Sequence, residues 1–165
     1  MGVAQTALER PFTLSDTTGR MISDRDLRGR WLMVVFGYTN CPDVCPTTLG
    51  SIAAVLDRLG SKATRVQPVF ITVDPSRDTP TALDAYLASF DHRIVGLTGS
   101  EERIAQAAAN FGAQYFRVPG NDPGAYAMAH SALVYVIGPE GGMVTQFANA
   151  NDPDTMASTL ASLID

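Results

Sequence analysis

Two continuous apolar runs with a helical segment between them restrict the fold of this chain more than any other feature. The runs are "RWLMVVFGYT" at residues 30–39 and "VQPVFITVD" at residues 66–74. Both lack the polar alternation of a half-exposed strand, which is typical of central strands buried on both faces. Between them, apolar residues recur with helical spacing at Leu49, Ile52, Ala53, Leu56 and Leu59. Buried strands joined by a helix pair in parallel, so the sequence predicts an α/β fold.

The remaining segments continue this alternation of strands and helices. Residues 11–29 predict short strands around a turn at Thr18 and Gly19, and residues 93–99 predict another short strand. Three further helices are predicted at residues 79–90, 100–112 and 152–164, opened by the capping residues Thr79, Ser100 and Asp152. Residues 118–129 are expected to form a loop, and residues 131–148 a β-hairpin across "GPEGG".

The order of these elements is that of a thioredoxin-like fold, with a βαβ start and a ββα finish. We expect a single domain over residues 1–165, with a central mixed sheet, flanking helices and an extra N-terminal hairpin. A flavodoxin-like sheet is the alternative, but the late hairpin argues against an all-parallel sheet. The length of 165 residues suits one compact domain, and no linker divides the chain.

Charge and hydropathy argue against several classes of protein. The net charge is −5 and no cluster of Lys and Arg occurs, so nucleic acid is not an expected partner. No apolar run approaches the roughly 20 residues of a membrane span. The opening "MGVAQTALER" lacks the basic start and apolar middle of a signal peptide. These features suggest a soluble domain cut from a longer, targeted or anchored protein, with Met1 and Gly2 as a cloning remnant.

The chain has two cysteines, Cys41 and Cys45, placed where the first buried strand ends and a helix is about to start. A helix N-terminus favours the thiolate, which is the form that binds metals and attacks disulfides. In a helical turn, this spacing would put both sulfurs on one face, and Pro42 and Pro46 would stiffen the turn. Such a pair suits a soft metal such as Cu(I). A redox pair fits the spacing equally well, and two ordinary buried cysteines are the simplest alternative.

A third ligand would favour the metal, and the chain offers two histidines. His92 lies beside charged residues between a helix and a strand, where a solvated loop residue is expected. His130 lies just before a buried strand, where histidines are often structural. In a thioredoxin topology, however, the loop that carries His130 approaches the first helix. Two thiolates and an imidazole suit copper. Met128 is expected to be a packing residue.

Acidic residues after the second buried strand are further candidates. Asp74, at the end of that strand, could orient a ligand through a hydrogen bond or could simply be a turn residue. Arg77 and Asp78 are expected to fix the same turn as a local ion pair.

Several sequence blocks resemble the Sco/SenC family. They are "GYTNCPDVCPTTL", "VFITVDPSRDTP", "IVGLTG", and "HS" before a strand ending in "GPEG". They follow the family's order, and the resemblance covers almost the whole chain. It implies a thioredoxin fold with extra elements. It also implies that copper, as Cu(I) or Cu(II), is held by Cys41, Cys45 and His130, with Asp74 supporting the site.

Members of this family carry copper to the binuclear copper centre of cytochrome c oxidase, or help keep that centre's cysteines reduced. The resemblance thus implies, as partner, the copper-site subunit of that oxidase or another periplasmic copper protein. It also implies an extracytoplasmic location, in the bacterial periplasm, for a parent protein anchored in the inner membrane. One departure is Ala129, where many members have an Asp before the histidine.

Three functions therefore stand as hypotheses. The first is a copper metallochaperone, and the second is a thiol–disulfide oxidoreductase that uses Cys41 and Cys45. A peroxidase of the same fold is the weakest, because no oxyanion-stabilising partner for a reactive cysteine can be identified. His130 separates the first two, since disulfide exchange does not require a histidine far along the chain.

Overall fold

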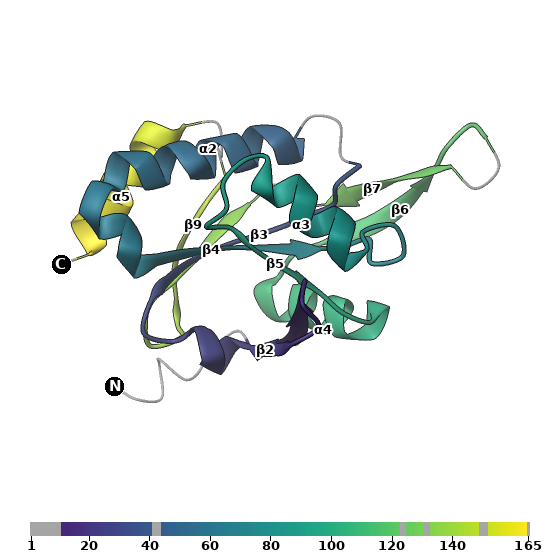
Figure 1. The fold of residues 1–165 in the computed structure, drawn as a ribbon, viewed down its shortest axis with the longest axis horizontal. Coiled ribbons are helices and arrows are strands. Elements are labelled where there is room, and N and C mark those ends of the chain that lie inside the picture. Colours follow the sequence, from purple (N-terminus) through teal and green to yellow (C-terminus); the bar gives the residue numbers. More distant parts are fainter. Residues whose placement is uncertain (1–10, 41–43, 123–124, 131–132, 149–151, 165) are drawn as a thin grey trace.

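The computed structural model describes residues 11–40, 44–122, 125–130, 133–148 and 152–164. A seven-stranded mixed sheet in the order β2-β1-β5-β4-β3-β8-β9 forms its centre, and β6 and β7 form a separate two-stranded sheet (Figure 1). The strands are β1 Thr13–Asp16, β2 Met21–Ser23, β3 Trp31–Gly37, β4 Val66–Thr72, β5 Val95–Thr98, β6 Tyr115–Pro119, β7 Tyr126–His130, β8 Val134–Ile137 and β9 Met143–Phe147. The helices are η1 Asp24–Leu27, α2 Val44–Leu59, η2 Gly60–Arg65, α3 Pro80–Ala88, α4 Glu101–Phe111 and α5 Pro153–Leu163.

The two apolar runs form the centre of the sheet, as predicted. Strands β3 and β4 are parallel, with register partners from Trp31↔Val66 to Gly37↔Thr72. Strand β5 adds in parallel to β4, whereas β8 runs antiparallel to β3. The mixed thioredoxin-like sheet and the N-terminal hairpin are therefore confirmed. Because β3 and β4 end in register, the segments that follow Gly37 and Thr72 lie at the same edge of the sheet.

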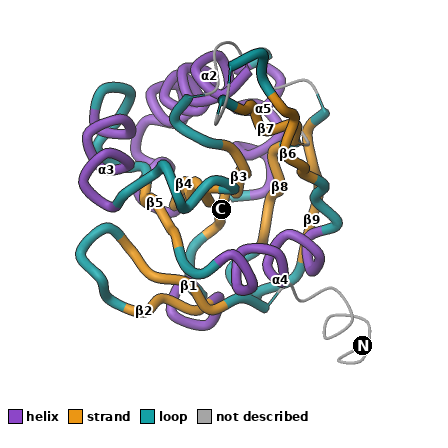
Figure 2. Tube along the Cα trace, turned by 90° about the vertical axis from the view of Figure 1, so that its right-hand side faces the viewer, coloured by secondary structure: helices purple, strands orange, loops and turns teal. Residues whose placement is uncertain are grey.

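Helices cover both faces of the sheet, and each face has its own core. Figure 2 shows α2, α3 and α5 on one side and α4 on the other. Along β3, Leu32, Val34 and Phe36 pack on the α4 side. Met33 and Val35 pack on the side of α2, α3 and α5. Burial on both faces explains why β3 is a continuous apolar run.

The helix ends follow the signals in the sequence. The side chains of Thr79, Ser100 and Asp152 accept hydrogen bonds from backbone amides in the first turns of α3, α4 and α5. Helix α4 ends at Gly112, whose φ of 75° lies in the left-handed region that favours glycine. Within the described ranges, no helix combines the length and apolar character needed to cross a bilayer.

The predicted loop at residues 118–129 is wrong at both ends, because β6 and β7 occupy them. These strands form an antiparallel pair from Tyr115↔His130 to Pro119↔Tyr126, and the pair projects from the body in Figure 1. Prolines and glycines around the turn obscured two short strands, of which only β7 buries a side chain, that of Met128. His130 is consequently the last residue of a strand.

Candidate functional site

The cysteine segment, residues 41–45, follows β3 in the chain and ends in the first turn of α2. Strand β3 ends at Gly37, and α2 is described from Val44. Cys45 is the second residue of α2, so its backbone lies at the positive end of the helix dipole. Cys41 and the side chain of Cys45 lie outside the described residues. The predicted thiol pair therefore stays a prediction, whereas its surroundings can be described.

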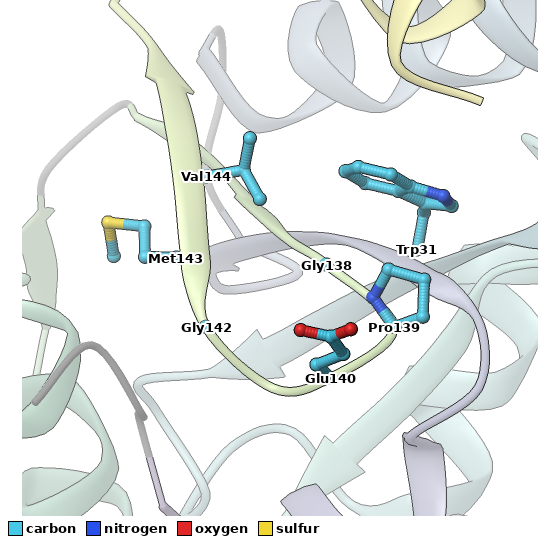
Figure 3. Close-up of a pocket in the computed structure, with 7 residues that line it drawn as sticks. All are labelled: Trp31, Gly138, Pro139, Glu140, Gly142, Met143 and Val144. Atoms are coloured by element: carbon cyan, nitrogen blue, oxygen red, sulfur yellow. The ribbon is translucent and has the colours of Figure 1, made fainter. Parts of the chain in front are cut away.

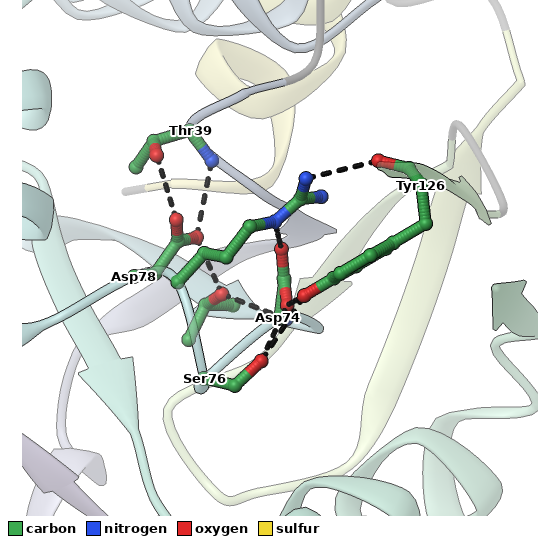
Figure 4. A network of polar contacts seen from close by, with 7 residues as sticks. Thr39, Asp74, Ser76, Asp78 and Tyr126 are labelled. Carbon is green, nitrogen blue, oxygen red and sulfur yellow. Dashed lines mark hydrogen bonds and ion pairs between the residues drawn. The ribbon is translucent and has the colours of Figure 1, made fainter. Parts of the chain in front are cut away.

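Asp78 fixes the approach to the cysteine segment. Its carboxylate accepts hydrogen bonds from the backbone N–H of Thr39 at 3.0 Å, from Thr39 Oγ1 at 2.6 Å and from Thr72 Oγ1 at 2.6 Å (Figure 4). The side chain is 1% exposed, and these donors replace the water that it has lost. Asp78 thus ties the turn after β4 to Thr39, two residues before Cys41.

The expected ion pair between Arg77 and Asp78 is wrong, because Arg77 pairs with Asp74 instead. Asp74 is 2% exposed and also accepts hydrogen bonds from Tyr126 Oη at 2.7 Å and Ser76 Oγ at 3.2 Å. Burial alone would lower the pKa of Arg77, but the hydrogen bond and negative charge of Asp74 outweigh it and raise that pKa above its ordinary value. The turn after β4 therefore holds two buried carboxylates whose hydrogen bonds meet at Thr72, because Thr72 Oγ1 donates to Asp78 and accepts from the backbone N–H of Asp74 at 3.0 Å.

His130 lies beside the strand that leads to the cysteines. Its half-buried imidazole meets the ring of Tyr38 edge-on, with ring centroids 5.8 Å apart and an interplanar angle of 88°. Tyr38 is 3% exposed and stands three residues before Cys41. The fold thus brings His130 to the strand end that precedes the cysteines, although His130 lies 85 residues further along the chain than Cys45, since 130 − 45 = 85.

The other candidate residues are placed as predicted. His92 is exposed in the turn before β5, at the sheet edge opposite the cysteine segment, so it is a solvated turn residue. Met128 is 9% exposed and packs in the core on the α4 side. Among the described side chains, no three His, Cys, Asp or Glu residues form a metal-binding group. A copper site made of His130 and the two cysteines therefore stays a prediction.

Sequence reasoning missed the aromatic contacts of Arg77. Its guanidinium carbon lies 3.7 Å from the centroid of the Tyr126 ring and 5.8 Å from that of Tyr38. Arg117 lies over the same Tyr126 ring at 4.2 Å. Tyr126 could have been found if residues 126–130 had been assigned to a strand, because Tyr126 and His130 then share a face.

A pocket lies far from these residues, at the other end of β3. Trp31, Pro139, Glu140, Met143 and Val144 line a pocket of about 310 Å³, together with Gly138 and Gly142 (Figure 3). Trp31 begins β3, whereas the cysteine segment follows the other end of that strand. At about 3.3 Å per residue, the two ends of this strand are roughly 20 Å apart. This pocket is separate from the candidate metal site.

The fold and the position of the cysteine segment define a thioredoxin-like α/β domain with its candidate site where a central parallel strand leads into a helix. The SCO1/SenC family model matches residues 2–165, and the chain belongs to this family. The resemblance seen in the sequence is thereby confirmed.

Individual relatives agree with this assignment. The chain is 35% identical over 162 residues to the human mitochondrial SCO1 homolog, covering 97% of this chain and 54% of that protein. It is similar to the Bradyrhizobium japonicum ScoI structure with copper bound, at 40% identity and a TM-score of 0.86, covering 94% of this chain and 98% of the other. Yeast Sco1 with copper bound is 35% identical with a TM-score of 0.85, covering 94% and 87%. The chain spans about half the length of the first curated relatives, between 54% and 57%.

Proposed function

We propose that this domain is a copper metallochaperone that serves the assembly of the binuclear copper centre of cytochrome c oxidase. Cys41, Cys45 and His130 bind the copper, as Cu(I) or Cu(II). Family membership and the similarity to two Sco structures with copper bound support this function. The partner is the copper-site subunit of the oxidase or another extracytoplasmic copper protein.

The observation that carries the proposal is the contact between His130 and Tyr38. It places an imidazole beside the strand end that continues into the cysteines. A Cu(II) site needs such a further donor, whereas thiol–disulfide exchange needs only the two thiols. This contact therefore favours copper binding over the alternative, a thiol–disulfide oxidoreductase that uses Cys41 and Cys45.

The donor set suits a protein that binds copper and then releases it. The start of a helix stabilises a thiolate through the helix dipole, and two thiolates hold Cu(I) without further help. Cu(II) prefers more donors, and an imidazole is a good one. His130 is the last residue of β7, outside the seven-stranded sheet, so its position depends on the β6–β7 hairpin. The same chain can thus hold both oxidation states, with His130 mattering most for Cu(II).

The location of the domain follows from the same proposal. We infer a parent protein anchored in the bacterial inner membrane, with this domain in the periplasm, where copper centres of the oxidase are assembled. The human SCO1 homolog and the bovine SCO2 homolog are mitochondrial proteins.

Asp74 supports the site without being a ligand.

The proposal is tested by copper titration of the reduced domain, followed by visible absorption spectra. One copper per chain is expected, because the chain has one pair of thiols. Cys41→Ser and Cys45→Ser should each abolish tight binding, since a hydroxyl stays protonated at neutral pH and is a hard, weak donor. Two or more tightly bound coppers per monomer, or unchanged binding by either variant, would contradict the proposed site.

A further inference from the structure

The hairpin that carries His130 packs on the core through Met128 and through the partly buried rings of Tyr115 and Tyr126. Within β6 and β7, only Met128 is buried, while Phe116 and Val118 are 64% and 39% exposed. A cavity of about 190 Å³ lies between the hairpin, the turn after β4 and α4, and Asp74 and Arg117 are among its lining residues. Because Met128 is the one buried side chain of β6 and β7, polar and stacking contacts also hold the hairpin in place.

Arg77 provides several of those contacts at once. Its Nη1 donates a hydrogen bond of 2.9 Å to the backbone carbonyl of Tyr126, and its guanidinium stacks 3.7 Å from the centroid of that ring. Its Nε pairs with Asp74, and its guanidinium carbon lies 5.8 Å from the ring centroid of Tyr38. One side chain therefore links the turn after β4, the end of β3 and the start of β7.

The geometry of β7 connects this clamp to the histidine. Tyr126 and His130 are four residues apart in one strand, so their side chains lie on the same face, about 13 Å apart along the strand. Arg77 and Asp74 hold the Tyr126 end, and the His130 end meets the ring of Tyr38. Loss of the contacts at the Tyr126 end would let β7 tilt, and the tilt would carry His130 away from the end of β3.

We propose that Arg77 is a positioning residue that holds β7, and with it His130, against the strand end that leads into the cysteine segment. This inference rests on the proposed function, in which His130 is a copper ligand. Asp74 then acts through Arg77 and Tyr126, because its two carboxylate oxygens accept hydrogen bonds from these side chains and from Ser76.

An arginine is required because the contacts need a planar group with several donors. A guanidinium can stack on a ring while its edge donates to a carboxylate and a carbonyl in one plane. A lysine retains the charge opposite Asp74 but cannot reproduce the stack and both hydrogen bonds together. The Nη2 of Arg77 is buried and has no hydrogen-bond partner among the described residues. The guanidinium therefore lies where it contacts the rings of Tyr126 and Tyr38, although its Nη2 makes no hydrogen bond there.

The test compares Arg77→Met and Arg77→Lys with the parent, and uses Arg103→Met as a control on an exposed arginine of α4. The first measurement is NMR of the imidazole protons in the reduced, metal-free protein. The chain has two histidines, so His92 serves as an internal reference. In Arg77→Met, the signals of His130 should move toward those of an unfolded chain, because the ring loses its fixed place beside Tyr38. The signals of His92 should stay.

The second measurement is copper affinity by competition with a chelator. Arg77→Met should weaken Cu(II) binding about 10- to 100-fold, the range of changes outside the ligand set. Cu(I) binding should change by no more than about threefold, since two thiolates suffice for it. Arg77→Lys should fall between the parent and Arg77→Met, and Arg103→Met should match the parent. A purely structural role would lower stability without this separation of the two oxidation states.

The outcomes separate this inference from the proposed function. Unmoved His130 signals in a folded Arg77→Met protein would overturn the positioning role, whatever the copper result. If His130→Ala leaves Cu(II) affinity unchanged, the proposed function fails, while the metal-free NMR result still decides the role of Arg77. If Arg77→Met does not fold, Tyr126→Leu carries the same test, because it removes the stacked ring from the other side of the clamp.

Discussion

Asp78→Ala should destabilise the domain strongly, although Asp78 is not expected to bind copper. The carboxylate accepts three hydrogen bonds, from the backbone and hydroxyl of Thr39 and from the hydroxyl of Thr72. A hydrogen bond to a charged group contributes about 1.5–3 kcal/mol. The three contributions are not additive, and removal of a buried charge offsets part of the loss. We therefore expect the free energy of unfolding to fall by about 3 kcal/mol, well above the effect of an ordinary surface substitution.

The assay is urea unfolding of the reduced, metal-free protein, with thermal unfolding beside it. For a domain of this size, about 3 kcal/mol corresponds to a decrease in Tm of about 6–12 °C. The matched control is Asp84→Ala, because Asp84 is exposed and accepts a single hydrogen bond of 3.3 Å, from Thr17. Its effect should stay within about 0.5 kcal/mol. Equal, small effects of the two substitutions would refute the assignment of Asp78 as the anchor of Thr39.

Three further predictions concern redox state, pH and packing. Mild oxidation should link Cys41 and Cys45 in a disulfide, with the loss of two hydrogens by mass spectrometry and of bound copper; undiminished copper affinity in the oxidised sample would count against the site. Hydrogen bonding to Arg93 lowers the pKa of Asp91, so this pair stabilises the fold above the unfolded pKa of about 3.8–3.9, and that contribution is lost as the pH falls through the lower folded value. Asp91→Asn should therefore flatten the acid limb of stability against pH, and an unchanged limb would contradict this. Gly96→Ala should cost about 1–3 kcal/mol in urea unfolding, because its Cβ would lie 2.7 Å from a leucine methyl of α3; a neutral effect would show that the core yields there.

Sequence patterns predicted the elements whose signals are local. Strand β3 is an apolar run because helices cover both its faces, and the caps at Thr79 and Ser100 form hydrogen bonds within the first turns of their own helices. The β6–β7 hairpin was missed because its turn residues are prominent, whereas the pairing of Tyr115 with His130 is visible only in three dimensions.

Polar contacts between residues far apart in the chain also could not be predicted from the sequence. Arg77 precedes Asp78 directly, which suggested a local ion pair, but the buried partners of Asp78 come from β4 and from Thr39. Arg77 pairs with Asp74 and reaches across to Tyr126, a residue 49 positions away. The sequence did indicate His130, because a thioredoxin topology brings its segment to the first helix. The contact with Tyr38 agrees with that expectation.

The central claim is that His130 completes a copper site with Cys41 and Cys45. Its most direct test is the Cu(II) dissociation constant of His130→Ala, measured by competition with a chelator, with circular dichroism to verify folding. Loss of a ligand should weaken Cu(II) binding by more than the ~10- to 100-fold expected for a change outside the ligand set, and should weaken Cu(I) binding less. His92→Ala, which alters an exposed turn residue, should bind like the parent. If folded His130→Ala binds Cu(II) as tightly as the parent, the three-ligand site is wrong, and the thiol–disulfide oxidoreductase becomes the better account.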